Sequence, residues 1–210
     1  MTDAHIIKNG AAPVPHPFDD TEESVESDSG EIVTAMRRFA ALIERTPWFT
    51  QLGEVLDGEL EKLTRDYLDA LGCPEVTVAP IREWETAELA ATNPEIDDTW
   101  WDTEEQLRLA ATAQALEVMD EDDFMAAVGI VVAKAADIVF EAAEQAAAMA
   151  DVDDQELIRA AAGAASKACH QAALVILSGG EQDHPFALKF RLFEAGRWPV
   201  SVTGGSFNLF

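Results

Sequence analysis

Two stretches of sequence decide the fold of this chain: FMAAVGIVVAKAADIVF, residues 124–140, and AAAGAASKACHQAALVIL, residues 160–177. Both are rich in alanine, a side chain that lets two helix axes approach closely, so we expect a tight antiparallel helical hairpin at the centre of the fold. The first helix is predicted to begin at Asp122 or Asp123 and to end near Ala150. The second is predicted to run from Asp153 to Gly179-Gly180. Each would be about 40 Å long at the helical rise of about 1.5 Å per residue.

Nothing in the sequence predicts a membrane-spanning or secreted protein. Lys134 and Asp137 interrupt the first stretch, and the unbroken apolar run before Lys134 is about half of the ~20 residues that a spanning helix needs. We interpret it as a buried core helix. Two cysteines, Cys73 and Cys169, give no disulfide framework, so the sequence predicts a soluble protein of the reducing cytoplasm.

Further elements are predicted on the N-terminal side of the hairpin. Thr46-Pro47 is typical of a helix start, Gly72 of a helix end, and Thr103 with Gln106 of a capping box. The predicted elements are a helix over 29–45, a helix over 46–71, a short strand over 75–79, a short helix over 80–91, a loop over 92–102 and a helix over 103–119. Before them, residues 1–28 combine prolines with a run of acids and are predicted to be a disordered acidic tail.

The C-terminal residues change character. Phe186–Phe193 alternates apolar and polar residues, and two further short strands are predicted at Pro199–Thr203 and Ser206–Phe210, separated by glycine turns. Such a three-stranded antiparallel meander is too small to be stable alone, so it must pack on the helices. The predicted fold class is therefore α+β, predominantly α-helical, with a helical domain over 29–180 and the meander over 181–210.

The chain is strongly acidic. It has 40 aspartate and glutamate residues against 14 lysine and arginine residues, a formal net charge of −26. Residues 181–210 carry three acids and three bases, so the whole excess lies in residues 1–180. Such a field repels nucleic acid and anionic membranes and attracts cations and basic proteins. We therefore expect a basic protein partner, no direct nucleic-acid binding and no membrane binding.

Two pairs of acids are the candidates for a metal site. Glu141-x-x-Glu144 ends the first hairpin helix, and Asp151-x-x-Asp154 follows in the turn. The pattern resembles the paired acidic motifs of all-α NTP pyrophosphohydrolases, which hold magnesium over a triphosphate, and that resemblance implies a magnesium-dependent hydrolase of phosphorylated small molecules. Capping and solvation of helix ends is the alternative interpretation, under which no cofactor is expected.

Two other groups of residues are candidates for contact with a partner. A tryptophan pair in an acidic segment either anchors a loop in the core or offers an exposed aromatic anchor to a basic partner. The only concentration of basic residues, on the predicted meander, is either a solvated face or a small docking surface for an acidic group. The candidates are Trp100, Trp101, Asp97, Asp98 and Asp102 in the first group and Lys189, Arg191 and Arg197 in the second.

The sequence carries no nucleophile elbow, and His170, which follows Cys169 on a predicted helix, is interpreted as a structural residue. It therefore predicts a non-enzymatic acidic protein-binding module that engages a basic protein, such as an adaptor, chaperone, inhibitor or immunity-type protein. The alternatives are the magnesium-dependent hydrolase and an inhibitor that mimics DNA. The oligomeric state stays open, a homo-oligomer included.

Overall fold

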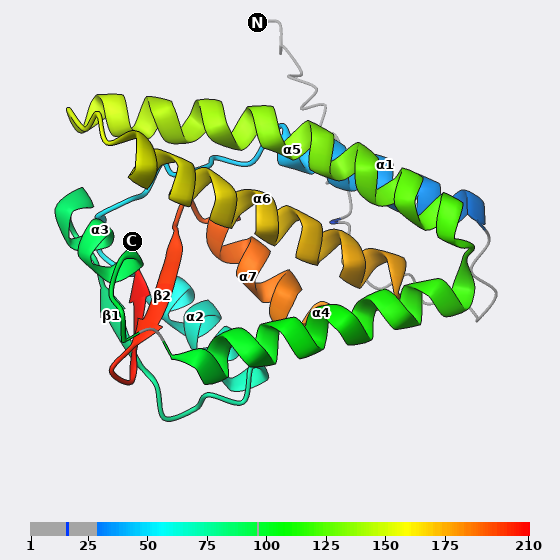
Figure 1. The fold of residues 1–210 in the computed structure, drawn as a ribbon, viewed down its shortest axis with the longest axis horizontal. Helices are drawn as coiled ribbons and strands as arrows, with labels where there is room; N and C mark the ends of the chain where they lie inside the picture. Colours follow the sequence, from blue (N-terminus) through cyan, green and yellow to red (C-terminus); the bar gives the residue numbers. More distant parts are fainter. Residues whose placement is uncertain (1–15, 17–28, 96) are drawn as a thin grey trace, which may run out of the picture.

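Helices dominate the fold of the computed structural model, which describes residues 16, 29–95 and 97–210 (Figure 1). The helices within these residues are α1 (Ser29–Ile43), α2 (Gly58–Ala70), α3 (Trp84–Ala91), α4 (Asp98–Val118), α5 (Glu121–Met149), α6 (Gln155–Leu177) and α7 (Pro185–Glu194). The strands are β1 (Thr77–Pro80), β2 (Pro199–Thr203) and β3 (Ser206–Leu209). The predicted fold class is confirmed. The tail predicted over residues 1–28 lies outside the described residues, apart from His16.

The predicted antiparallel hairpin is present as α5 and α6, which lie side by side in Figure 1. Asp151 adopts a left-handed conformation (φ 57°) after α5, and the amide of Val152 donates to the Ala147 carbonyl at 2.9 Å. This 6→1 hydrogen bond closes the helix end, a place that glycine usually takes. The buried stripe of α5 recurs every three or four residues through Phe124, Val128, Val131, Ala135, Val139 and Ala143, and it ends with Ala146 and Ala147.

Helix α6 is the central element. It contacts α1, α3, α4, α5, α7 and β2, and most of its side chains after the first turn are buried or half-buried. In Figure 1, α4 and α5 diverge from the short turn that joins them, and α6 lies between them. Helix α6 ends as predicted, with Gly179 in a left-handed conformation (φ 67°). None of the helices in the described ranges combines the length and the hydropathy that a membrane span requires.

Residues 186–193 form helix α7, not the predicted strand. The His184 ring accepts a hydrogen bond from the Phe186 amide at 3.1 Å, and Pro185 occupies the first helical turn. At the other end Gly196 has φ 74°, and the Arg197 amide donates to the Leu192 carbonyl at 3.0 Å. Nearly all sides of α7 are buried, so its sequence shows no apolar stripe of helical period.

The sheet is mixed rather than an antiparallel meander, with strand order β1-β3-β2. Strand β1 pairs in parallel with β3, where Thr77 lies opposite Ser206, and β2 pairs antiparallel with β3, where Val202 lies opposite Phe207. The strands predicted at 75–79, 199–203 and 206–210 are present within one or two residues. Because α7 takes the place of the expected first strand, β1 supplies the third strand from far earlier in the sequence.

Only the second half of the segment 46–71, predicted as one helix, is helical, and it forms α2. Before α2, the consecutive residues Trp48 and Phe49 are both buried. Consecutive side chains of a helix do not point to the same face, so one buried helix face could not take both. Phe49 adopts a left-handed conformation (φ 59°), and the Trp48 indole donates to the Ile43 carbonyl at 3.0 Å. Helix α2 begins only at Gly58, where the Asp57 carboxylate caps it.

Candidate functional site

The two tryptophans of the acidic segment have different environments. Trp100 is 7% exposed and packs in the core, whereas Trp101 is 55% exposed. The ammonium of Lys167 lies 4.0 Å from the centre of the Trp101 ring, a cation–π contact at the surface. The segment therefore provides both a core anchor and an exposed aromatic ring.

The acids around these tryptophans include the cap of helix α4. The Asp97 carboxylate accepts hydrogen bonds from the amides of Thr99 (2.8 Å) and Trp100 (3.3 Å), so α4 begins at Asp98, five residues before the predicted start at 103. Asp102 is exposed on the first turns of the helix. Asp97 thus has a structural task, and a partner contact at Trp101 and Asp102 stays a prediction.

A buried polar cluster lies one helical turn beyond Trp100 and is centred on Glu104. The Glu104 side chain is 1% exposed, and both of its carboxylate oxygens are hydrogen-bonded. Oε1 pairs with the Lys189 ammonium and accepts from the Tyr67 hydroxyl at 3.1 Å. Oε2 pairs with the Lys167 ammonium at 2.8 Å and accepts from the Gln171 amide at 3.3 Å. We call these five residues the Glu104 cluster.

Four helices position the Glu104 cluster. Glu104 comes from α4, Tyr67 from α2 and Lys189 from α7. Lys167 and Gln171 are four residues apart on α6, a spacing that places them on one side of that helix. The cluster therefore connects the four helices at their common contact.

The charges of the cluster favour ionised Glu104. Burial alone raises the pKa of this carboxyl, but the positive charges of Lys189 and Lys167 and their hydrogen bonds outweigh burial and lower the pKa from 4.5 to about 2. Burial also raises the pKa of Tyr67, and Glu104 adds to that shift, so the phenol stays protonated and donates. Both oxygens of this buried, ionised carboxylate are hydrogen-bonded within the fold, so we interpret the arrangement as a structural one.

The contribution of Glu104 to stability should depend on pH. Its folded-state pKa of about 2 lies below its ordinary value of 4.5, so its stabilising contribution is complete above pH 4.5 and is lost as pH falls toward 2. We expect the difference in free energy of unfolding between the wild type and E104Q to narrow over that range, measured by urea denaturation at stepped pH. A difference that stays constant from pH 6 to pH 2.5 would contradict the assignment.

The three bases predicted to form a docking surface are not gathered at one surface. Lys189 is 3% exposed, and its ammonium forms an ion pair with Glu104, so it cannot contact a partner. Arg191 is half-buried, and its guanidinium donates to the Gln182 side chain at 2.8 Å. Arg197 is 4% exposed, and it donates to the backbone carbonyls of residues 54 and 55. The strand geometry assumed for Lys189 and Arg191 is absent because this segment is α7.

The four acids considered for magnesium are arranged as helix-end residues. Glu141 and Glu144 are exposed near the end of α5, where Glu141 accepts from the Gln145 side chain at 3.2 Å. Asp154 caps α6 by accepting from two backbone amides, at 2.8 and 3.0 Å. Asp151 lies exposed in the turn. In the part of the chain that the structure describes, no three acidic, histidine or cysteine side chains gather as metal ligands.

The Glu104 cluster is the arrangement that sequence reasoning missed. A signal was present, because Glu104 stands four residues after Trp100 and seven before Ala111, on the stripe that α4 buries. A charged residue on a buried stripe needs a counter-charge. The sequence does not identify that counter-charge, since Lys167 and Lys189 lie on helices far along the chain.

Acidic side chains dominate the surface at the turn between α4 and α5. Five of them, all exposed, occur within seven residues: Glu117, Asp120, Glu121, Asp122 and Asp123. Asp120 also caps α5, accepting from the Asp123 amide at 2.9 Å. No lysine, arginine or histidine occurs between Arg108 and Lys134. We call these five residues the α4–α5 acidic turn.

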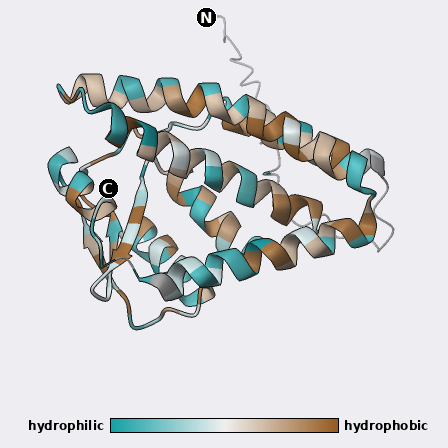
Figure 2. Cartoon of the chain, in the orientation of Figure 1, coloured by the Kyte–Doolittle hydropathy of each residue, from teal (hydrophilic) through white to brown (hydrophobic). Residues whose placement is uncertain are grey.

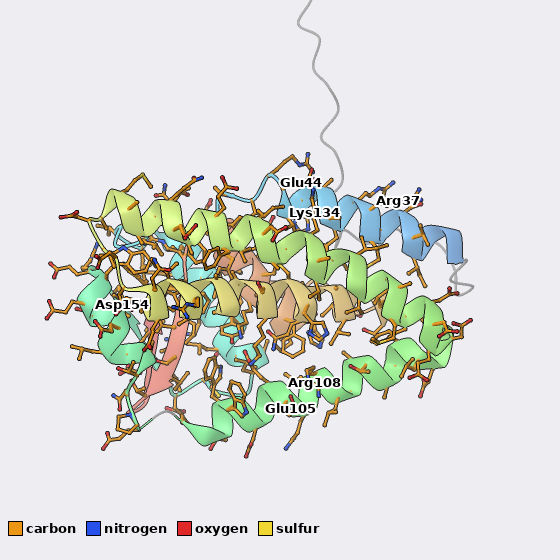
Figure 3. All side chains as sticks on the ribbon, turned by 45° about the horizontal axis from the view of Figure 1, so that its top comes forward. Arg37, Glu44, Glu105, Arg108, Lys134 and Asp154 are labelled. Atoms are coloured by element: carbon orange, nitrogen blue, oxygen red, sulfur yellow. The ribbon has the colours of Figure 1, made fainter. Side chains whose placement is uncertain are left out.

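Ion pairs neutralise few of the acids. Within the described ranges, the carboxylates paired with lysine, arginine or histidine are those of Glu44, Asp66, Glu104, Glu105 and Glu194. Figure 3 labels two of these pairs on the surface, Glu44 just after α1 with Lys134 of α5, and Glu105 with Arg108 on α4.

Comparison of the chain with protein families, with curated proteins and with solved structures finds no match.

Proposed function

We propose that this chain is a non-enzymatic binding module that engages a basic protein through its acidic helical surface. The observation that carries the proposal is the α4–α5 acidic turn, five exposed carboxylates without an intervening base. Such a surface attracts positive charge and accelerates association with a basic partner. Adaptor, chaperone, inhibitor and immunity-type roles all use this kind of recognition.

The enclosed nature of the Glu104 cluster also supports a binding role. The Glu104 carboxylate is buried among four helices, and both of its oxygens are hydrogen-bonded within the fold, so it is not exposed to a substrate. The exposed acids, in contrast, are placed to meet another macromolecule. Recognition through exposed charges is screened over about 10 Å at 0.1 M salt, so affinity should fall as salt rises.

The test is capture of a partner by the immobilised full chain from a lysate of its own cell, followed by calorimetry on the purified pair at 50 and 300 mM NaCl. We expect the captured protein to be basic, and its dissociation constant to rise severalfold between the two salt concentrations. Duplex DNA, added as a control, should not bind the chain. An acidic or neutral partner whose affinity is independent of salt would contradict the proposal.

A further inference from the structure

An apolar groove lies beside the α4–α5 acidic turn, where α1, the end of α4 and the first half of α5 meet. Its volume is about 210 Å³. Its apolar walls come from Ile32, Val33 and Met36 of α1, Val118 of α4, and Ala126 and Ile130 of α5. In Figure 2 the first half of α5 is mostly brown, in keeping with the apolar residues of this stretch.

Several of the large apolar side chains that line the groove are exposed to solvent. Val33 is 47% exposed, Val118 55% and Ile130 59%, and these three side chains come from three different helices. Ala126 adds no bulk between α1 and α5, which leaves the space hollow. Large apolar residues gathered around a hollow are typical of a binding surface, whereas a single exposed apolar side chain is not.

The charge around the groove is polarised. Asp123 of the α4–α5 acidic turn itself lines the groove, and Val118 and Met119, which also line it, belong to the same stretch of chain. Arg37 of α1, labelled in Figure 3, is the basic residue of the lining. A ligand that fills the groove with apolar side chains would therefore meet carboxylates at the turn.

We propose that this groove binds the apolar face of a basic amphipathic helix belonging to another protein, an inference that rests on the proposed function and names its site. Helix-in-groove recognition uses apolar anchors at i, i+3 or i+4, and i+7, and the groove walls are themselves helices. Lysine or arginine next to those anchors pairs with the α4–α5 acidic turn. Charge disfavours the other occupants: a second copy carries the same net charge of −26, and residues 17–28 of this chain hold six acids and no base.

The probe for the test is a fluorescein-labelled 14-residue peptide of leucine and lysine, arranged to form an amphipathic helix. Its control is the same composition scrambled so that leucines are spread around the helix. We expect saturable 1:1 binding of the first peptide to the full chain by fluorescence anisotropy, with clearly weaker binding of the scrambled one. The variant V33Q/I130Q should weaken binding at least about tenfold, because two apolar contacts are lost at positions too exposed to affect folding.

Matched variants separate the groove from the rest of the surface. L89Q/M149Q removes two exposed apolar side chains elsewhere and should leave the affinity within about twofold. E117Q/E121Q/D122N should weaken binding and reduce its salt dependence, whereas E141Q/E144Q/D153N, with the same charge change near the far end of α5, should do so much less.

Each failure has its own meaning. Equal binding of the two peptides, unchanged in V33Q/I130Q but still sensitive to salt, would overturn the groove and leave the proposed function intact. Absence of binding by either peptide, together with a salt-insensitive natural partner, would overturn both. Displacement of the probe by a synthetic peptide of residues 1–28 would identify this chain's own segment as the occupant and overturn the proposal.

Discussion

The variant E104Q is expected to lose about 3–5 kcal/mol in free energy of unfolding, the largest effect of a single substitution that we anticipate. Glutamine keeps the shape of the side chain but removes the negative charge between two ammonium groups. Lys189 is 3% exposed, so its charge would be left buried without a counter-ion. Lys167 is one-third exposed and can turn toward solvent, so Lys189 accounts for most of the loss. Urea denaturation followed by circular dichroism measures the change.

Two further variants make the E104Q result specific. E105Q, the same substitution one residue along α4, removes an exposed pair with Arg108 and should leave the stability close to that of the wild type. The double variant E104M/K189M removes both buried charges of the pair and should recover part of the loss, because a well-packed apolar pair often replaces a buried ion pair at little cost. Equal stabilities of E104Q and E105Q would mean that Glu104 is not buried between the lysines.

The variant G196A is expected to have the second-largest effect, for reasons of backbone and space together. Gly196 ends α7 at φ 74°, and a left-handed conformation costs an alanine about 1–2 kcal/mol. A Cβ atom there would lie 2.8 Å from Thr50 Oγ1 and 2.9 Å from the Gln51 amide nitrogen. Crowding of this kind adds about 1–3 kcal/mol, since Gln51 is held by its own hydrogen bond to the Gly196 carbonyl.

Two other glycines provide the controls for G196A. Gly72 has the same φ of 74° but open space around its Cβ position, so G72A should show the backbone cost alone. Gly163 lies within α6 with nothing near its Cβ position, so G163A should raise stability by about 0.5–1 kcal/mol. The expected order of thermal midpoints is G163A, wild type, G72A, G196A. If G196A were as stable as G72A, the segment with Thr50 and Gln51 would not crowd a Cβ atom at the end of α7.

The long helices could be predicted from the sequence because each shows a local pattern. The alanine-rich α5 and α6 are the clearest case, and the glycine pair at the end of α6 also proved reliable. The prediction was wrong for α7 because this helix is almost completely buried and therefore lacks the polar face on which helical periodicity depends. Its boundary signals, Pro185 at the start and Gly196 at the end, were present and outweigh a loose alternation of eight residues.

The candidate sites depend on tertiary contacts, which the spacing of residues along the sequence does not predict. Lys189 was placed on an exposed strand face, and only the packing of α7 against α2 and α6 brings it to Glu104. The apolar groove likewise requires the start of α1 to lie beside the α4–α5 turn. The acidity itself was readable at once from composition, and it is the part of the functional proposal that sequence reasoning supplied.

An NMR titration of the isotope-labelled full chain with the leucine–lysine amphipathic peptide shows directly where on the molecule the peptide binds. We expect the backbone amide shifts to concentrate in 32–37, 117–123 and 126–130, the residues of the groove and of the α4–α5 acidic turn. The amides around Asp97, Trp101 and Asp102 should hardly move, because this peptide is expected in the groove and not at the separate partner contact predicted for Trp101 and Asp102. Shifts centred on Trp101, or spread evenly over all acidic helix ends, would show that the peptide does not bind in the groove.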